Sequence, residues 1–211
     1  MGLFTANKPV PDQAERDERL LKMELDGRAL RSQVEDLQEL VRHLDQDRDL
    51  LLGALERMRP GGEPDALAQV LLDISFKPLG LACFYVALAD WDRDQLRFVL
   101  YQEGGRIRGH PSRRLSEGLG LSEKVLSECR PIYIRNLEEG RAAGSLLTAA
   151  EEATGLIPHS WYGVPFGQGA RPDGLVSFQS FHSDAFSASR RRVMDALAAL
   201  LSTCLGPLQA R

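Results

Sequence analysis

The residues best suited to catalysis or metal binding are few in this 211-residue chain and lie far apart. A nucleophilic thiol, a general base or a transition-metal site would draw on its cysteines and histidines, which are Cys83, Cys129, Cys204, His43, His110, His159 and His182. Their spacing matches no metal-ligand motif. The sequence also contains no phosphate-binding P-loop, no dinucleotide fingerprint and no HExxH pair. We therefore expect no catalytic residue and no metal site.

The cysteine count and the overall charge indicate the compartment and the partners. Three isolated cysteines do not make a disulfide framework, so each is interpreted as a small buried hydrophobe in a reducing compartment. The first residues lack a signal-peptide pattern, and no apolar run is long enough to cross a bilayer. The net charge of −4 gives no general attraction to nucleic acid or to an anionic membrane. We expect a cytoplasmic protein that has neither as a partner.

One loop concentrates positive charge: Arg106, Arg108, Arg113 and Arg114 lie close together in the sequence. Their guanidinium groups could hold an anionic ligand or an acidic partner through charge-assisted hydrogen bonds. The alternative is a solvated loop. No aromatic residues alternate with the arginines and no recognition helix accompanies them, so the loop is weak evidence for nucleic-acid binding.

The first structural element that the sequence predicts is a long helix in the first quarter of the chain. Apolar residues there follow a seven-residue grid: Leu20, Met23, Leu30, Val34, Leu37, Val41, Leu44, Leu51, Leu55 and Met58. Every d position is Leu or Met, and valines occupy two central a positions, a combination that favours a parallel two-stranded coiled coil. The pattern predicts a homodimer. The alternative is a helical hairpin that folds back on the rest of the chain.

The helix is interrupted by a segment in which Pro60 and Pro64 enclose two glycines. Proline cannot continue the helical hydrogen-bond ladder, and glycine adds backbone freedom. We predict a disordered N-terminus at residues 1–11, a parallel coiled-coil dimerisation helix at 12–59, a hinge at 60–64 and a folded domain at 65–211.

Beyond the hinge, the hydrophobic pattern changes from helical spacing to short alternating or apolar runs. Strands are predicted at 81–88, 95–101, 131–134, 159–166 and 173–180. Helices are expected from Asp65, from Leu121 and from Ser187. The resulting class is α+β: an antiparallel sheet flanked by helices, preceded by the long coiled-coil helix.

Five stretches of this second region, taken in order, resemble the GAF domain family. Glu117–Ser122 is similar to the family's glycine-rich entry into a middle helix, and Cys129–Ile134 is similar to its Gly-Arg-Pro-Val strand. Tyr162–Phe166 and Gly174–Ser180 resemble its Val-Pro-Leu and Gly-Val-Leu-Ser-Leu-Gln-Ser hairpin. Phe186 and Ser187 precede the last helix as the family's Phe-Thr/Ser signature does. The resemblance runs from about residue 65 to residue 205.

This resemblance implies a sheet whose first and last helices share one face, with loops over the other face that can enclose a small-molecule pocket. The family is regulatory: members bind cyclic nucleotides, tetrapyrroles, small metabolites or no ligand, and often dimerise. The Asn-Lys-Phe-Asp-Glu signature of cyclic-nucleotide binders is absent here, and no cysteine matches a bilin attachment site. We therefore expect no cofactor and no covalent bilin, whereas a non-covalent ligand is compatible with the sequence.

The implied pocket would be lined from the covered sheet face and from residues 137–158. Its candidate ligand-binding residues are Tyr101, Tyr133, Asn136, His159, Trp161 and Ser177. The alternative is that Trp161 and the tyrosines only fill the core.

The leading hypothesis is a cytoplasmic, non-enzymatic regulator, homodimeric through its coiled coil, that acts on an unknown protein partner under small-ligand control. One alternative is a structural or scaffolding dimer with a ligand-free GAF domain. The other is a small cysteine redox enzyme similar to the family's free-methionine-sulfoxide reductase.

Overall fold

The computed structural model describes most of the chain between Gln13 and Gly206. The described residues are 13–103, 106–108, 111–118, 120–146, 151–152 and 155–206. Three parts of the predictions fall outside the described residues. They are the disorder predicted for residues 1–11, the candidate His110, and residues 147–150 and 153–154 of the expected pocket cover. By its internal contacts the chain divides into two units, Met1–Asp45 and Gln46–Arg211.

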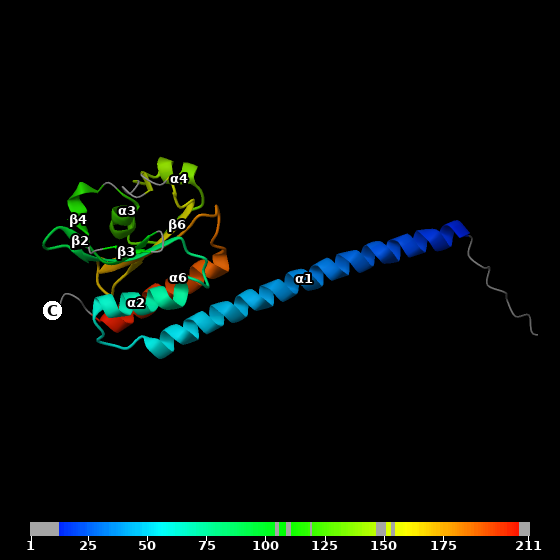
Figure 1. Cartoon of the computed structure of the whole chain (residues 1–211), viewed down its shortest axis with the longest axis horizontal. Helices are drawn as coiled ribbons and strands as arrows, with labels where there is room; N and C mark the ends of the chain where they lie inside the picture. Colours follow the sequence, from blue (N-terminus) through cyan, green and yellow to red (C-terminus); the bar gives the residue numbers. More distant parts are fainter. Residues whose placement is uncertain are drawn as a thin grey trace, which may run out of the picture. The chain divides into compact units, whose positions relative to one another are not determined.

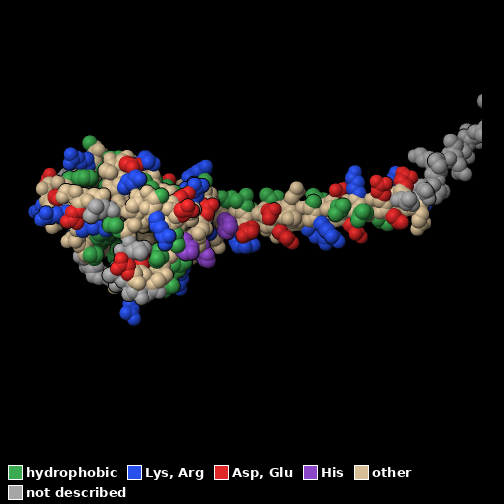
Figure 2. Space-filling model, turned by 90° about the horizontal axis from the view of Figure 1, so that it is seen from above, with side chains coloured by type: hydrophobic (Ala, Val, Ile, Leu, Met, Phe, Trp, Pro, Cys, Tyr) green, Lys and Arg blue, Asp and Glu red, His purple; other side chains and the backbone are tan. Residues whose placement is uncertain are grey.

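Helix α1 (Gln13–Arg57) is 45 residues long and forms all the described structure of the first unit (Figure 1). Its predicted seam residues there are each at least half exposed: Leu20, Met23, Leu30, Val34, Leu37, Val41 and Leu44. Hydrophobic side chains recur along this helix in Figure 2. An apolar stripe of this length on an isolated helix is typical of a surface that another chain covers.

The last three turns of α1 belong to the second unit and pack against its core. Leu50, Ala54 and Met58 are buried in the core of that unit, and Leu51 packs against it. Met58, predicted on the intermolecular seam, is instead 3% exposed within its own protomer. Leu55 stays 58% exposed. The heptad pattern identified the apolar positions but could not say which partner covers each one.

The boundary between the units therefore differs from the predicted one. We expected the helix to be separate from the folded domain up to the hinge at 60–64, yet the core contacts begin at Leu50, about three helical turns before the hinge. The helix ends at Arg57, and the backbone N–H of Gly61 donates to the carbonyl of Cys204 at 2.8 Å. Pro64 occupies the first turn of the next helix, where proline costs no hydrogen bond.

The second unit is built on one antiparallel sheet, whose described strands run in the order β3-β2-β1-β7-β6-β5, with β4 pairing beside β3 on β2. The strands are β1 (Cys83–Asp90), β2 (Gln95–Glu103), β3 (Arg106–Arg108), β4 (Ser112–Arg114), β5 (Ile132–Ile134), β6 (Ser160–Phe166) and β7 (Gly174–Ser180). The helices are α2 (Pro64–Ser75), the 3-10 turn η1 (Leu115–Glu117), α3 (Leu121–Glu128), α4 (Leu137–Ala142) and α6 (Ala188–Leu205). This confirms the predicted α+β class.

Helices cover both faces of the sheet (Figure 1). On one face, α2, α6 and the end of α1 enclose the larger apolar core, which includes Phe84, Val86 and Phe178. On the other face, α3 and neighbouring segments cover a second core that contains Tyr85 and Leu175. Adjacent residues of β1 thus point into different cores, as the two-residue period of a strand requires.

An irregularity in the pairing of β1 with β2 sets which residues of β2 reach each core. Tyr85 pairs with Tyr101, but Ala87 pairs with Phe98, so one residue of β2 is extra. The consecutive residues Val99 and Leu100 are consequently both part of the larger core, on the side of α2 and α6. A bulge of this kind reverses the side-chain alternation on one strand only. Phe98 and Tyr101 therefore lie on the same face although they are three positions apart.

None of the described helices combines the length and the apolar character that crossing a lipid bilayer requires.

One position in this fold carries backbone strain that a substitution can release. Cys129 ends α3 in the left-handed region with φ +50°, a conformation that costs a residue with a Cβ about 1–2 kcal/mol. We predict that Cys129→Gly raises the free energy of unfolding by about 0.5–1 kcal/mol, because relief of strain exceeds the added entropy of the unfolded glycine. Urea denaturation measures the change.

The control is Cys129→Ala, which keeps the Cβ while removing the thiol that lies 3.4 Å from the carbonyl of Leu126. No stabilisation is expected in this variant. Equal stabilisation by both substitutions would contradict the explanation from backbone strain.

Candidate functional site

A cavity of about 570 Å³ lies on the face of the sheet opposite α2 and α6. This volume is typical of sites for small molecules. Strands β1, β2, β5, β6 and β7 supply lining residues, and β4, α3, α4 and the segment before β6 supply the others. The lining includes Tyr85, Phe98, Tyr101, Glu103, Arg113, Leu121, Ser122, Ile134, Asn136, Leu137, Gly140, Arg141, Glu151, Ile157, His159, Trp161 and Gln179.

Aromatic rings from the neighbouring strands β1 and β2 form the floor of the cavity. Tyr85 and Tyr101 are stacked, with ring centroids 5.4 Å apart and an interplanar angle of 6°. Phe98 meets both rings edge-on, at 5.2 Å from Tyr85 and 5.8 Å from Tyr101. Offset-stacked and edge-to-face arrangements are the favourable geometries for aromatic pairs, so the three rings stabilise one another and form a mostly apolar floor.

The hydroxyl of Tyr85 is the polar centre beneath this floor. It lies 2.8 Å from the hydroxyl of Ser122 and also bonds the side chains of Ser177 and Trp161. Burial raises the pKa of Tyr85 despite these bonds, so the phenol stays neutral. Gln179 donates from Nε2 to the hydroxyl of Ser177 at 3.2 Å. These buried polar groups are therefore satisfied within the protein.

Trp161 contributes the largest ring of the wall, and its position depends on Gly163. A Cβ at position 163 would lie 2.0 Å from the indole Cη2 atom, so only glycine leaves room for the ring. The two residues are on the same side of β6 because they are two positions apart. Trp161 itself is 8% exposed.

The ion pair between Arg113 and Glu123 borders the cavity. The Nε and Oε1 atoms are 2.6 Å apart, and Nη2 donates to Oε2 at 3.0 Å. The guanidinium also lies over the ring of Phe98, 5.2 Å from its centroid. The Glu123 side chain is only 7% exposed, so the charge of Arg113 already balances a buried carboxylate.

The described arginines of the predicted anion site do not share one location, because β3 and β4 pair with opposite ends of β2. Arg113 lines the cavity, whereas Arg106 on β3 and Arg114 on β4 are exposed. Arg108 lies on β3, but its side chain is outside the described part.

A more polar part of the wall lies around Tyr101, where Glu103 and Glu151 are both more than nine-tenths buried. Burial, followed by the charge of Glu103, raises the pKa of the Tyr101 phenol. Tyr101 therefore remains a neutral hydroxyl at physiological pH, able to donate a hydrogen bond.

The structure brings together four of the six residues predicted to bind a ligand: Tyr101, Asn136, His159 and Trp161 line the cavity. Ser177 does not line it; this serine is fully buried on β7, below the floor. Tyr133 is on the opposite side of the sheet, where its ring packs against the larger core. Its hydroxyl donates to Asp184 Oδ1 at 3.0 Å.

Several wall residues were not predicted from the sequence, most prominently Tyr85, Phe98 and the residues of α4. A signal for Tyr85 was present, because it lies two positions from apolar Ala87 and therefore on the same face of a predicted strand. No signal marked Phe98, since its orientation depends on the extra residue in β2.

The cysteines are distributed over β1, the end of α3 and α6, where Cys83 and Cys204 are buried and Cys129 is exposed. Burial raises the pKa of the Cys204 thiol. Among the described residues, no group of three or more His, Cys, Asp or Glu side chains could hold a metal ion.

Comparison with known proteins connects this architecture to one family. A family model described as "GAF domain" matches residues 62–205, a span that contains all five stretches on which the resemblance was based. No curated protein sequence matches the chain significantly.

Solved structures of similar fold come from regulatory and enzymatic proteins. The GAF domain of an Acinetobacter phosphoenolpyruvate-protein phosphotransferase is 18% identical, with a TM-score of 0.58 over 77% of this chain and 91% of that one. The corresponding domain from Coxiella burnetii is 14% identical, with a TM-score of 0.60 over 77% and 92%. Free methionine-R-sulfoxide reductase from Neisseria meningitidis, in complex with its substrate, is 15% identical, with a TM-score of 0.56 over 68% and 78%. At these identities the likeness concerns the fold alone.

The contact between Trp161 and Gly163 generates a prediction for the cavity wall. Gly163→Ala should lower the free energy of unfolding by about 1–3 kcal/mol, because the added methyl group forces the indole ring from its place. In a Trp91→Phe background Trp161 is the remaining tryptophan, and its fluorescence spectrum should shift.

Gly140→Ala on α4 is the matched control. Its Cβ would come no closer than 3.5 Å to another side chain, so this variant should be as stable as the parent or more stable. Similar loss of stability in both variants would show that the tryptophan contact is not the cause.

Proposed function

This chain belongs to the GAF domain family, and we propose that it is a cytoplasmic, non-enzymatic regulator, homodimeric through α1, whose cavity binds a small ligand. The observation that carries ligand binding is the cavity itself. It combines an aromatic floor with a few polar groups, and this combination is usual in sites that select small molecules.

The arrangement of the cysteines supports a regulator rather than a redox enzyme. A catalytic cysteine needs an accessible thiolate. Cys83 and Cys204 are buried, and the raised pKa of Cys204 favours its neutral thiol. Cys129 is exposed, but it lies at the end of α3, whereas the other two cysteines lie on β1 and α6.

Dimerisation is supported by the exposed seam of α1 in the first unit. Each seam residue there is at least half exposed, and burying such a stripe between two helices removes a large apolar area from water. In a parallel pair, Asp26 would face Arg31 of the other copy, a register-setting attraction of opposite charges. The output would be a contact with another protein.

Ligand control predicts a thermal response that depends on the cavity. Cyclic AMP, cyclic GMP, biliverdin and a panel of free amino acids, including methionine sulfoxide, should be screened by thermal unfolding. Binding of one of these at 100 times its dissociation constant stabilises the folded state by about 2.7 kcal/mol. Tyr101→Ala, which removes part of the floor, should weaken that binding about tenfold or more.

Phe181→Ala is the control, because this exposed aromatic does not line the cavity and its removal should leave affinity unchanged. If no compound in the screen raises the unfolding temperature, ligand control is rejected in favour of a scaffolding dimer. Equal weakening by both substitutions would place the binding site elsewhere.

The dimer prediction is tested by sedimentation. Leu37→Lys together with Leu44→Lys puts charge at two d positions, so the protein should sediment as a monomer. The globular unit should unfold at an unchanged temperature, because both residues belong to the first unit.

The matched control is Leu21→Lys together with Leu25→Lys, at b and f positions on the same helix, and it should remain a dimer. A monomeric parent protein, or an unchanged mass for the Leu37 and Leu44 variant, would refute the proposal.

A further inference from the structure

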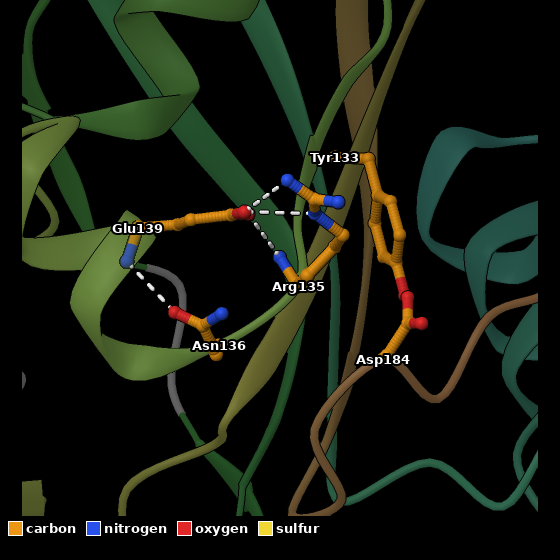
Figure 3. A network of polar contacts seen from close by, with 5 residues as sticks. All are labelled: Tyr133, Arg135, Asn136, Glu139 and Asp184. Carbon is orange, nitrogen blue, oxygen red and sulfur yellow. Dashed lines mark hydrogen bonds and ion pairs between the residues drawn. The ribbon is translucent and has the colours of Figure 1, made fainter.

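A polar network joins the wall of the cavity to the opposite layer of helices. Figure 3 shows its middle part, from Asn136 and Glu139 to Asp184. On the cavity side, Asn136, Leu137, Gly140 and Arg141 are lining residues at the start of α4 and within it. The side chain of Asn136 caps this helix by accepting the backbone N–H of Glu139 at 2.9 Å. The orientation of α4 is thus fixed at its first turn, next to the cavity.

Glu139 ties this first turn to the end of β5. Its Oε2 accepts the backbone N–H of Arg135 at 2.8 Å, and its Oε1 accepts the Arg135 Nε–H at 2.7 Å. This resembles a capping box displaced by one residue. The bonds from Arg135 hold the pKa of Glu139 below its usual value, so the carboxylate is charged at neutral pH.

From β5 the network continues to the segment before α6. The carbonyl of Arg135 accepts the backbone N–H of Asp184 at 2.7 Å. Asp184 accepts the hydroxyl of Tyr133 at 3.0 Å, and that hydroxyl accepts the N–H of Phe186 at 3.2 Å. Asp184 lies in the left-handed region with φ +50°, which aspartate adopts more readily than most residues that carry a Cβ.

The last contacts reach α6 itself. The guanidinium of Arg191 lies 4.4 Å from the centroid of the Tyr133 ring and donates to the carbonyl of Phe186 at 2.6 Å. α6 belongs to the layer that includes α2 and the final turns of α1, with which it shares the larger core. A displacement of α4 therefore has a continuous path of hydrogen bonds to the first turn of α6.

We propose that the chain Glu139–Arg135–Asp184–Tyr133 couples the cavity wall to α6, so that occupancy of the cavity alters the stability of the first turn of α6. The proposal rests on the proposed function only in taking the cavity as the input. These bonds make the stabilities of α4 and of the first turn of α6 depend on each other. Such coupling is reciprocal, so a change at α6 must also change the stability of α4.

Reciprocity allows a test without any ligand, by hydrogen–deuterium exchange on the full chain. Glu139→Gln removes the charge that holds Arg135, and amides in residues 184–193 as well as in α4 should exchange about two- to fivefold faster. Glu138→Gln removes the same charge from the adjacent exposed position, and should leave residues 184–193 unchanged.

The reverse direction uses Tyr133→Phe, which deletes the hydroxyl but keeps the ring under Arg191. Exchange in α4 should again rise about two- to fivefold. Tyr162→Phe is the control: it deletes the hydroxyl that donates to Asp195 of α6 at 2.7 Å, outside the chain to α4, so α4 should be unaffected. Exchange in α3 serves as the reference for global stability.

The coupling is disproved if Glu139→Gln accelerates exchange in α4 alone, or if Tyr133→Phe leaves α4 unchanged or affects it no more than Tyr162→Phe does. These outcomes do not depend on the thermal screen. A failed screen removes ligand control but not the coupling, and a failed exchange test removes the coupling but not ligand binding.

Discussion

The alternation of side chains along the central strands is the constraint on which the rest of the second unit depends. Each face of the sheet is buried by a different layer, so Phe84 and Val86 must point toward α2 and α6 while Tyr85 points toward the cavity. A shift of one residue would exchange these sets. The extra residue in β2 adds a second condition, because it brings Phe98 and Tyr101 to the same face. The cavity floor is thus a consequence of register, before any ligand is considered.

Helix α1 shows the same principle on a helical surface. Its apolar residues recur every three or four positions. Leu50, Ala54 and Met58 are nevertheless buried within their own protomer, whereas Leu37 and Leu44 are exposed. The helix is continuous from Gln13 to Arg57, and its end is connected to α6 through the bond from Gly61 to Cys204. One helix therefore supplies both a piece of the GAF core and the surface proposed for dimerisation.

The α+β class, the family and the order of the main elements were predictable from the sequence, because hydrophobic period and turn residues are local signals. The short elements β3, β4 and α4 were not predicted. The side to which each strand residue points was not. Tyr133 alternates with Ile132 and Ile134, and only the packing of those two isoleucines toward the cavity side sends the tyrosine the other way. The partner of Met58 was equally hidden, since apolar spacing does not distinguish an intramolecular contact from an intermolecular one.

Tyr133, one of the two predicted pocket residues that do not line the cavity, has a more informative place in the structure. Tyr133 lies between the cavity wall and α6, where one hydroxyl serves both Asp184 and Phe186. Exposed ion pairs such as that of Arg135 with Glu139 contribute little to overall stability. Regulation requires little: a coupling free energy of about 1–3 kcal/mol already changes affinity by about 5- to 150-fold. A few weak bonds between two otherwise separate cores are therefore suited to transmit a signal, because they can be broken without unfolding either core.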